Sequence, residues 1–265
     1  MTIIFYAILF VLGVCFGSFL CCQARRLHYN TSHKTKLHTS RSVCLHCHYQ
    51  LKWYDNIPIF SWLILRGKCR KCHKPIGIAE LLSELGTGLV LLIFGITFNP
   101  LTADVLAWVA FCALLIFTLS VCFLAIYDGL YGELPTKCLI ISIILAIVVL
   151  TLQYGVLLTN NPFTSDYLWR PLAAVAILGG LYLLLYLISK GKWVGDGDWL
   201  LATALAIVLA DPWSALIALF LANLLACLVM LPVMFFFKSS KSHKIYFGPF
   251  LVIAFVITYA IISLW

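Results

Sequence analysis

The sequence predicts an all-α membrane protein, a polytopic bundle of about eight transmembrane helices with one long polar loop. Composition is the first reason: 63% of the 265 residues are hydrophobic, only 11% are charged, and the mean hydropathy is +1.03. A soluble domain carries about 25% charged residues. Patterning is the second reason, because the apolar residues gather in long stretches, and about 20 residues suffice to cross a bilayer. The chain therefore needs lipid around much of its surface.

Eight apolar stretches are candidate spans. The first lacks the basic start and small-residue exit of a signal peptide, so we expect a retained helix. The sixth is short and begins at a Gly-Asp-Gly-Asp loop, so we expect it to be partly re-entrant or set inside the bundle. In chain order, the predicted spans lie at roughly 2–24, 82–99, 103–127, 138–158, 171–189, 198–210, 213–237 and 245–265.

The basic residues predict the orientation. Most of the 18 Lys and Arg residues lie between Arg25 and Lys74. With the N-terminus outside and eight spans, every basic residue except Arg170 falls on the cytoplasmic side, as the positive-inside rule favours. We therefore interpret the net charge of +8 as a topology signal, helped by anionic lipid, and expect no nucleic-acid partner. The predicted division is a first helix at 1–24, a cytoplasmic loop at 25–80 and a seven-helix membrane core at 81–265.

Four cysteines in the loop form two Cys-x-x-Cys pairs, Cys44 with Cys47 and Cys69 with Cys72, separated by 21 residues. This spacing is typical of a tetrahedral zinc site, so the fold includes a cytoplasmic zinc-binding loop. Two redox or unliganded pairs are the alternative, and disulfides are disfavoured in the reducing cytoplasm. A closed four-thiolate site would shape the loop, supply much of its folding energy and take no part in catalysis.

Other candidate ligands and cysteines have simpler interpretations. His46, His48 and His73 lie near the pairs and could substitute as ligands, but four cysteines suffice. The remaining seven cysteines lie in or beside apolar helices, where we expect small buried hydrophobes. They are Cys15, Cys21, Cys22, Cys112, Cys122, Cys138 and Cys227.

Between the cysteine pairs, residues 51–67 are aromatic and apolar for a segment that faces water. One interpretation is a strip on the membrane surface, with Trp53, Tyr54 and Trp62 at the level of the headgroups. The other is a docking surface for a substrate or cofactor. Composition alone does not choose between them.

Two aspartates are the candidate chemical groups. Asp128 and Asp198 each lie where an apolar stretch meets a polar loop, and carboxylates beside hydrocarbon are functional candidates. Together they could form an acid/base dyad. Gly195 and Gly197 would let the backbone take unusual conformations and let a substrate approach. Alternatively, Asp198 merely caps its helix.

The other acids rank lower. Asp196 is second to Asp198, and Glu133 is a minor competitor at the water edge. Asp104, Asp166 and Asp211 are interpreted as solvated loop or cap residues.

Several motifs resemble those of the type IV prepilin peptidases, membrane aspartic proteases of the Gly-x-Gly-Asp type. The loop from Cys44 to Cys72 is the most specific part, and the similarity covers nearly the whole chain. The other matching segments are Gly17-Ser18-Phe19-Leu20 with Arg25-Arg26, Glu84-Leu85, Asp128 with Leu134-Pro135, Gly195-Asp196-Gly197-Asp198, and Phe247-Gly248-Pro249-Phe250. The chain departs from the family pattern at Glu80-Leu81, Thr136 and Leu200.

The resemblance implies that Asp128 and Asp198 are catalytic, supported by Gly195, Gly197 and Asp196. It implies an enzyme of the bacterial cytoplasmic membrane that removes the leader of type IV prepilins or pseudopilins at the cytoplasmic face, after a Gly. It also implies methylation of the new N-terminus with S-adenosylmethionine, although no nucleotide-binding motif is visible and no residue is assigned to this cofactor.

Two other classes of function compete with this interpretation. A multi-pass proton-coupled transporter could use the aspartates as a proton relay. However, no acids interrupt the middles of the helices, and internal repeats are not evident. A non-enzymatic assembly factor for pili or secretion could instead use the zinc loop to recruit a partner.

Overall fold

The computed structural model describes residues 2–33, 43–44, 46–47, 49–98, 103–160, 165–192, 194–236 and 246–264. Within these residues the structure is helical, with only two isolated β-bridges, as the sequence predicted. The chain forms two compact units, Met1–Ile96 and Thr97–Trp265. The predicted division into a first helix at 1–24, a loop at 25–80 and a membrane core at 81–265 stays a prediction.

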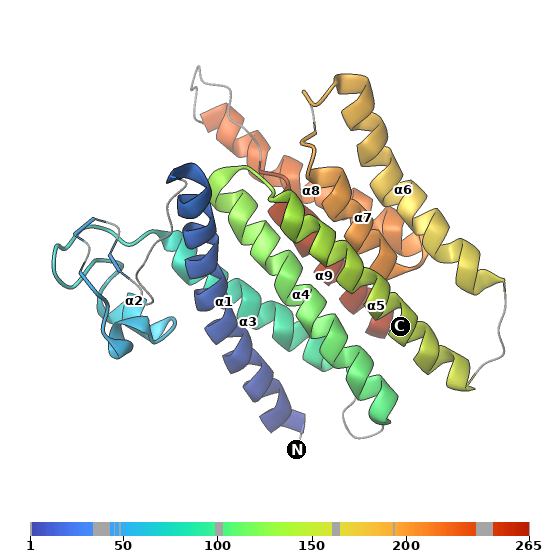
Figure 1. Cartoon of the computed structure of the whole chain (residues 1–265), viewed down its shortest axis with the longest axis horizontal. Coiled ribbons are helices and arrows are strands. Elements are labelled where there is room, and N and C mark those ends of the chain that lie inside the picture. Colours follow the sequence, from blue (N-terminus) through green and yellow to red (C-terminus); the bar gives the residue numbers. More distant parts are fainter. Residues whose placement is uncertain are drawn as a thin grey trace. The chain divides into compact units, whose positions relative to one another are not determined.

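Unit 1 contains α1 (Thr2–His33), the short 3-10 helix η1 (Trp53–Asn56), α2 (Phe60–Ile64) and α3 (Ile78–Thr97) (Figure 1). The apolar part of α1 matches the predicted span 2–24, but the helix continues to His33 because no proline or glycine interrupts its polar end. The predicted loop at 25–80 therefore begins as helix. It also contains η1 and α2, two short helices that the sequence analysis did not predict.

Close packing joins α1 to α3. A Cβ atom added at Gly13 would lie 2.7 Å from the Thr87 carbonyl oxygen and 2.8 Å from the Gly88 Cα. One added at Gly17 would collide with the Ser83 carbonyl oxygen and lie 2.8 Å from the Glu84 Cα. Small residues allow such backbone approach in membranes, where dispersion forces drive much of helix association.

Unit 2 contains six helices: α4 (Val105–Tyr131), α5 (Thr136–Asn160), α6 (Asp166–Ser189), α7 (Asp198–Leu209), α8 (Pro212–Phe236) and α9 (Gly248–Leu264). Each of the eight predicted apolar segments is thus helical over most of its described residues. Six helices of the described chain are long and apolar enough to cross a membrane, whereas α7 and α9 are shorter. The chain is therefore a multi-pass membrane protein with about the predicted number of apolar helices.

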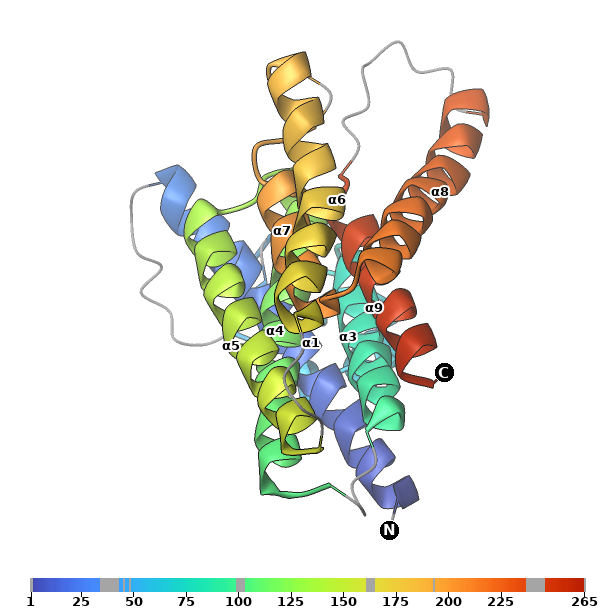
Figure 2. The same cartoon turned by 90° about the vertical axis from the view of Figure 1, so that its right-hand side faces the viewer.

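The short α7 lies inside unit 2, as expected for the sixth segment. Its 12 residues rise about 18 Å, less than the roughly 30 Å of a hydrocarbon core. Leu201, Ala202 and Leu205 are fully buried, and the helix packs against α5, α6 and α9. Figure 2 shows α7 beside α6 in the upper part of unit 2.

Asp104 and Asp211 cap helices of unit 2, as the sequence analysis expected for loop or cap acids. The Asp104 carboxylate accepts the Ala107 N–H at 2.8 Å and caps α4. The Asp211 carboxylate accepts the Ser214 N–H at 3.1 Å at the start of α8. Asp166 is the first residue of α6 and accepts a hydrogen bond from the Trp169 indole.

Substitution of Gly17 by Ala should weaken the packing of α1 on α3, because the new methyl group has no space against the backbone of α3. We expect a loss of about 1–3 kcal/mol, typical of overpacking, measured as a lower thermal midpoint of the purified protein in detergent. Gly86→Ala is the matched control, since a Cβ there meets nothing within 4 Å. Equal midpoints for the two variants would contradict the packing argument.

Candidate functional site

The four loop cysteines converge on one point, as their spacing predicted. The sulfur atoms of Cys44, Cys47, Cys69 and Cys72 all lie within 4.8 Å of one another. The Cys44–Cys72 and Cys47–Cys69 sulfur pairs are each 3.9 Å apart. Tetrahedral zinc with metal–sulfur bonds of about 2.3 Å requires sulfur separations of about 3.8 Å. The cluster therefore has the size and ligand set of a four-thiolate metal site.

The two cysteine pairs lie in matching turns, which we call the first knuckle (43–50) and the second knuckle (68–75). Each turn is closed by an antiparallel bridge, from Val43 to Gln50 and from Lys68 to Pro75. The N–H of each first cysteine donates a 2.9 Å hydrogen bond to the carbonyl five residues later. This repeated geometry presents two sulfur atoms from each turn to the same point.

The thiols differ in acidity because of their surroundings. Backbone N–H groups, first of Cys72 and then of Lys71, lower the pKa of the Cys69 thiol to about 7. The Tyr49 N–H lowers the pKa of Cys47, but desolvation and the three neighbouring thiols outweigh it and raise the pKa to about 11. Four thiolates this close repel one another, so a cation among them would be needed to hold all four ionised.

The histidines do not join this cluster. His46 and His73 are exposed and lie outside the metal-ligating group, which contains cysteines alone among the described residues. His48 lies outside the described residues.

The segment between the knuckles is tied to the second one. The Asp55 carboxylate, whose side chain is 1% exposed, accepts the Arg70 Nε–H at 2.8 Å. The Arg70 guanidinium also lies over the Tyr54 ring, 5.1 Å from its centroid. A buried carboxylate needs such a partner, so η1 and the second knuckle hold each other in place.

Asp128 lies in the last turn of α4, which extends four residues beyond the predicted end at 127. The residue is buried, at 5% exposure. Its Oδ2 accepts a 2.8 Å hydrogen bond from the Gly248 N–H at the start of α9. A Cβ at Gly248 would lie 2.9 Å from this oxygen, so the close approach requires glycine.

Asp198 is the first residue of α7 and is half-buried. Its Oδ2 accepts the Gly195 N–H at 3.1 Å, a group that lies before the helix. Gly197, and not Asp198, holds the cap position, and no side chain caps this helix. The alternative interpretation of Asp198 as a simple N-cap is therefore wrong.

The two aspartates belong to the same end of unit 2. Asp128 is in the last turn of α4, and Asp198 is the first residue of α7. Gly197 packs on the Leu134 side chain, which lies between α4 and α5, so the loops that follow α4 and precede α7 are in contact. Asp196 and Glu133 are exposed, which supports their lower rank.

Sequence reasoning missed a polar pair near this end. The Asn223 amide of α8 donates a 3.1 Å hydrogen bond to the hydroxyl of Tyr182 on α6, which is 3% exposed. The Tyr182 ring packs on Phe247, with 5.4 Å between centroids, next to the Gly248 that contacts Asp128. Asn223 is a single asparagine in an otherwise apolar segment, and this feature of the sequence could have indicated a buried polar contact.

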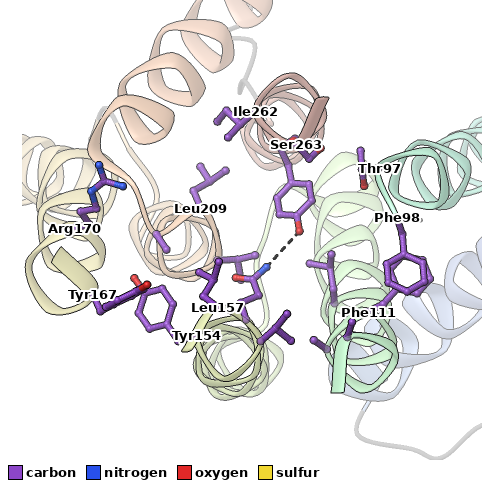
Figure 3. A pocket seen from close by; sticks show the side chains of 18 of the residues that line it. Thr97, Phe98, Phe111, Tyr154, Leu157, Tyr167, Arg170, Leu209, Ile262 and Ser263 are labelled. Carbon is purple, nitrogen blue, oxygen red and sulfur yellow. Dashed lines mark hydrogen bonds between the residues drawn. The ribbon is translucent and has the colours of Figure 1, made fainter. Parts of the chain in front are cut away.

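A cavity of about 670 Å³ lies at the other end of unit 2. It is lined by the first turns of α4 and α6 and the last turns of α5, α7 and α9 (Figure 3). Asp128, in contrast, is in the last turn of α4. Within it, Gln153 donates a 3.3 Å hydrogen bond to the Tyr259 hydroxyl. The cavity therefore does not contain Asp128 or Asp198.

Comparison with known proteins supports one family. Residues 11–98 match the family model for the Bacterial Peptidase A24 N-terminal domain. A prepilin leader peptidase/N-methyltransferase of Aeromonas hydrophila is 32% identical over 219 residues, 81% of this chain and 69% of that protein. Proteins of the same name from Dickeya chrysanthemi and Myxococcus xanthus are 32% identical over 218 residues and 42% identical over 107. These alignments cover 80% and 39% of this chain and 70% and 31% of those proteins. No solved structure matches the chain.

The fold and the cysteine cluster define a polytopic membrane protein with a loop whose four cysteines could hold a metal ion. With relatives of this identity and coverage, the chain belongs to the prepilin leader peptidase/N-methyltransferase family.

Loss of a single ligand should empty the metal site. We expect the purified protein to carry one metal ion per chain by elemental analysis, and the Cys44→Ser and Cys69→Ser variants to lose it. The loop of both variants should become sensitive to protease, because metal binding supplies folding energy in small domains. Cys227→Ser is the control, since this cysteine is exposed on α8, outside the cluster. A wild-type loop that resists protease without bound metal would contradict a structural site.

Proposed function

We propose that this protein is an integral-membrane aspartic endopeptidase that cleaves the leader of type IV prepilins or pseudopilins. One observation carries the proposal: two carboxylates, Asp128 and Asp198, lie at the same end of unit 2, each bonded to a backbone N–H from a glycine. Membership of the prepilin leader peptidase/N-methyltransferase family supports the same chemistry.

The geometry suits general acid/base hydrolysis. Among the described residues, Oδ2 of each carboxylate accepts a backbone N–H and Oδ1 does not, so Oδ1 could contact water or substrate. In the proposed mechanism one aspartate is ionised and the other is protonated, because two neighbouring carboxylates do not easily ionise together. The ionised aspartate takes a proton from the attacking water. The protonated one donates a hydrogen bond to the carbonyl oxygen as negative charge develops there.

The glycines beside the aspartates give the substrate access. A side chain at Gly248 would crowd the Asp128 carboxylate, and one at Gly195 would lie 3.1 Å from Oδ2 of Asp198. Asp196 occupies the variable position of the Gly-x-Gly-Asp turn and is exposed, so we assign it a supporting role and no acid/base role. An extended peptide with small residues at its cleavage point could approach these carboxylates closely.

We also propose that the active end and the cysteine loop face the cytoplasm of a bacterial inner membrane, with the N-terminus outside. The basic residues support this orientation. Lys137, Lys190 and Lys192 lie beside the connections at the aspartate end, whereas Arg170 lies at the other end in the first turns of α6. A substrate with a basic leader and an apolar helix would then lie along the bundle.

Two cofactors complete the proposal. Zinc is the metal that fits four thiolates at these separations best. It would hold the two knuckles together. S-adenosylmethionine would supply the methyl group for the new N-terminal amine, as the name of the relatives implies. No residue of this chain is assigned to S-adenosylmethionine.

The transporter and the non-enzymatic assembly factor are not favoured. The two carboxylates lie at one end of unit 2 and do not form a path through it. The named relatives are enzymes.

Asp128→Asn and Asp198→Asn should each lower the rate of leader cleavage by roughly 10²–10⁴-fold, the usual contribution of an acid/base group. The amide keeps the shape of the side chain and removes its proton chemistry. The mass of a co-expressed prepilin measures the result, because loss of the leader and gain of a methyl group are both visible.

Glu133→Gln is the matched control, because Glu133 is exposed and lies in the same connection as Leu134. It should process the prepilin at the wild-type rate. Full processing by either aspartate variant would overturn the dyad. If the wild-type protein gives a cleaved but unmethylated product, the proposed methyl transfer is contradicted and the proposed peptidase activity is not.

A further inference from the structure

The short helix α2 presents an apolar face to its surroundings. Phe60, Leu63 and Ile64 are 66%, 55% and 75% exposed, and their i, i+3, i+4 spacing places them on one side of the helix. Ile57, just before the helix, is also exposed. We call these four residues the α2 face. Exposure of these four apolar side chains to water would be unfavourable. The position of the α2 face relative to the membrane therefore decides what the face contacts.

The start of α2 is bonded to a membrane-spanning helix. The Ile59 N–H donates a 2.7 Å hydrogen bond to Oε2 of Glu84, a buried residue of α3. Ile59 itself has a φ of 63°, a conformation that a β-branched residue rarely adopts. The surrounding contacts must therefore hold it there.

The depth of this bond follows from the packing of α1 on α3. Glu84 lies beside Gly17 of α1, whose Cβ would be 2.8 Å from the Glu84 Cα. Arg25, the first charged residue of α1, pairs with Glu80 at 2.7 Å. Gly17 precedes Arg25 by eight residues, which correspond to about 12 Å along a helix. On α3, Glu84 follows Glu80 by four residues, about 6 Å further from the start of the helix. The start of α2 is therefore on the membrane side of the Arg25–Glu80 pair.

The side chains at this depth are apolar and exposed. Phe16 and Phe19 of α1, on either side of Gly17, are 40% and 55% exposed within the described structure. Helices with one apolar face lie in the interface, roughly 5–10 Å into the boundary between headgroups and acyl chains. The α2 face lies at the level where α1 presents aromatic side chains to lipid.

Charged residues follow α2 immediately. Arg66 and Lys68 are exposed and begin where the apolar face ends. Long basic side chains at such positions reach phosphate groups while their stems stay in the apolar layer. The pattern of apolar helix followed by exposed cations matches the polarity change from acyl chain to anionic headgroup.

From these observations we propose that α2 is an interfacial membrane anchor, with the α2 face inserted in the phospholipid leaflet that α1 and α3 cross. The anchor has a rigid connection to the second knuckle. The Trp62 carbonyl accepts the Gly67 N–H at 2.9 Å, and the Gly67 carbonyl accepts the Ile76 N–H at 2.6 Å. Insertion of α2 would thus hold the metal-binding loop against the membrane surface.

Photo-crosslinking of the full-length protein tests the anchor. p-Benzoylphenylalanine replaces Phe60, Leu63 or Ile64 in separate variants. Lys74, which is exposed on the second knuckle, is replaced as the control. Each variant is placed in nanodiscs of phosphatidylethanolamine and phosphatidylglycerol and irradiated, and adducts are identified by intact mass. We expect several-fold more lipid adduct at the three α2 positions than at Lys74.

Lipid adducts no more abundant than at Lys74 would overturn the anchor. So would adducts to an added prepilin or to a second copy of the chain in place of lipid. A second measurement avoids the bulky probe: trypsin cleavage after Arg66 in the same nanodiscs. Cleavage should be several-fold faster in Ile64→Asp than in wild type and unchanged in Lys74→Asp. Equal rates for Ile64→Asp and wild type would also overturn the proposal.

Discussion

A buried carboxylate in an apolar protein must find a hydrogen-bond donor, and this constraint organises the polar parts of the molecule. Glu84 accepts the Ile59 N–H, Asp128 accepts the Gly248 N–H, and Asp198 accepts the Gly195 N–H. In each case the donor is a backbone group of a connecting segment. Each acid therefore ties a loop to a particular place on a helix, and two of these places form the proposed active site.

The loop that carries the four cysteines is stabilised by a few specific polar interactions. It is too small to bury a large core, and cysteine sulfurs and one ion pair replace that core. The four sulfur atoms join the two knuckles, and Asp55 with Arg70 joins the intervening segment to the second knuckle. Because such a loop depends on a few strong interactions, loss of one ligand affects all of it.

Much of the molecule could be predicted from local patterns. Composition predicted the eight apolar helices, and cysteine spacing predicted the cluster, because both signals lie in neighbouring residues. Helix ends were harder: α1 continues to His33, and α4 includes Asp128 in its last turn. Polar residues can extend a helix into water, so the apolar pattern alone does not locate its end. The contact of Tyr182 with Phe247 joins residues distant in the chain and left no local pattern.

By itself, the sequence determined the class of protein, the ligand set of the metal site and the two candidate aspartates, since these depend on residue type and spacing. The tertiary structure decided which backbone N–H each carboxylate accepts, that Asp198 does not cap α7, and that Ile59 bonds to Glu84. Those outcomes depend on how separate helices approach one another. Close approach at glycines such as Gly17 and Gly248 sets that geometry, through distances between segments that no local pattern encodes.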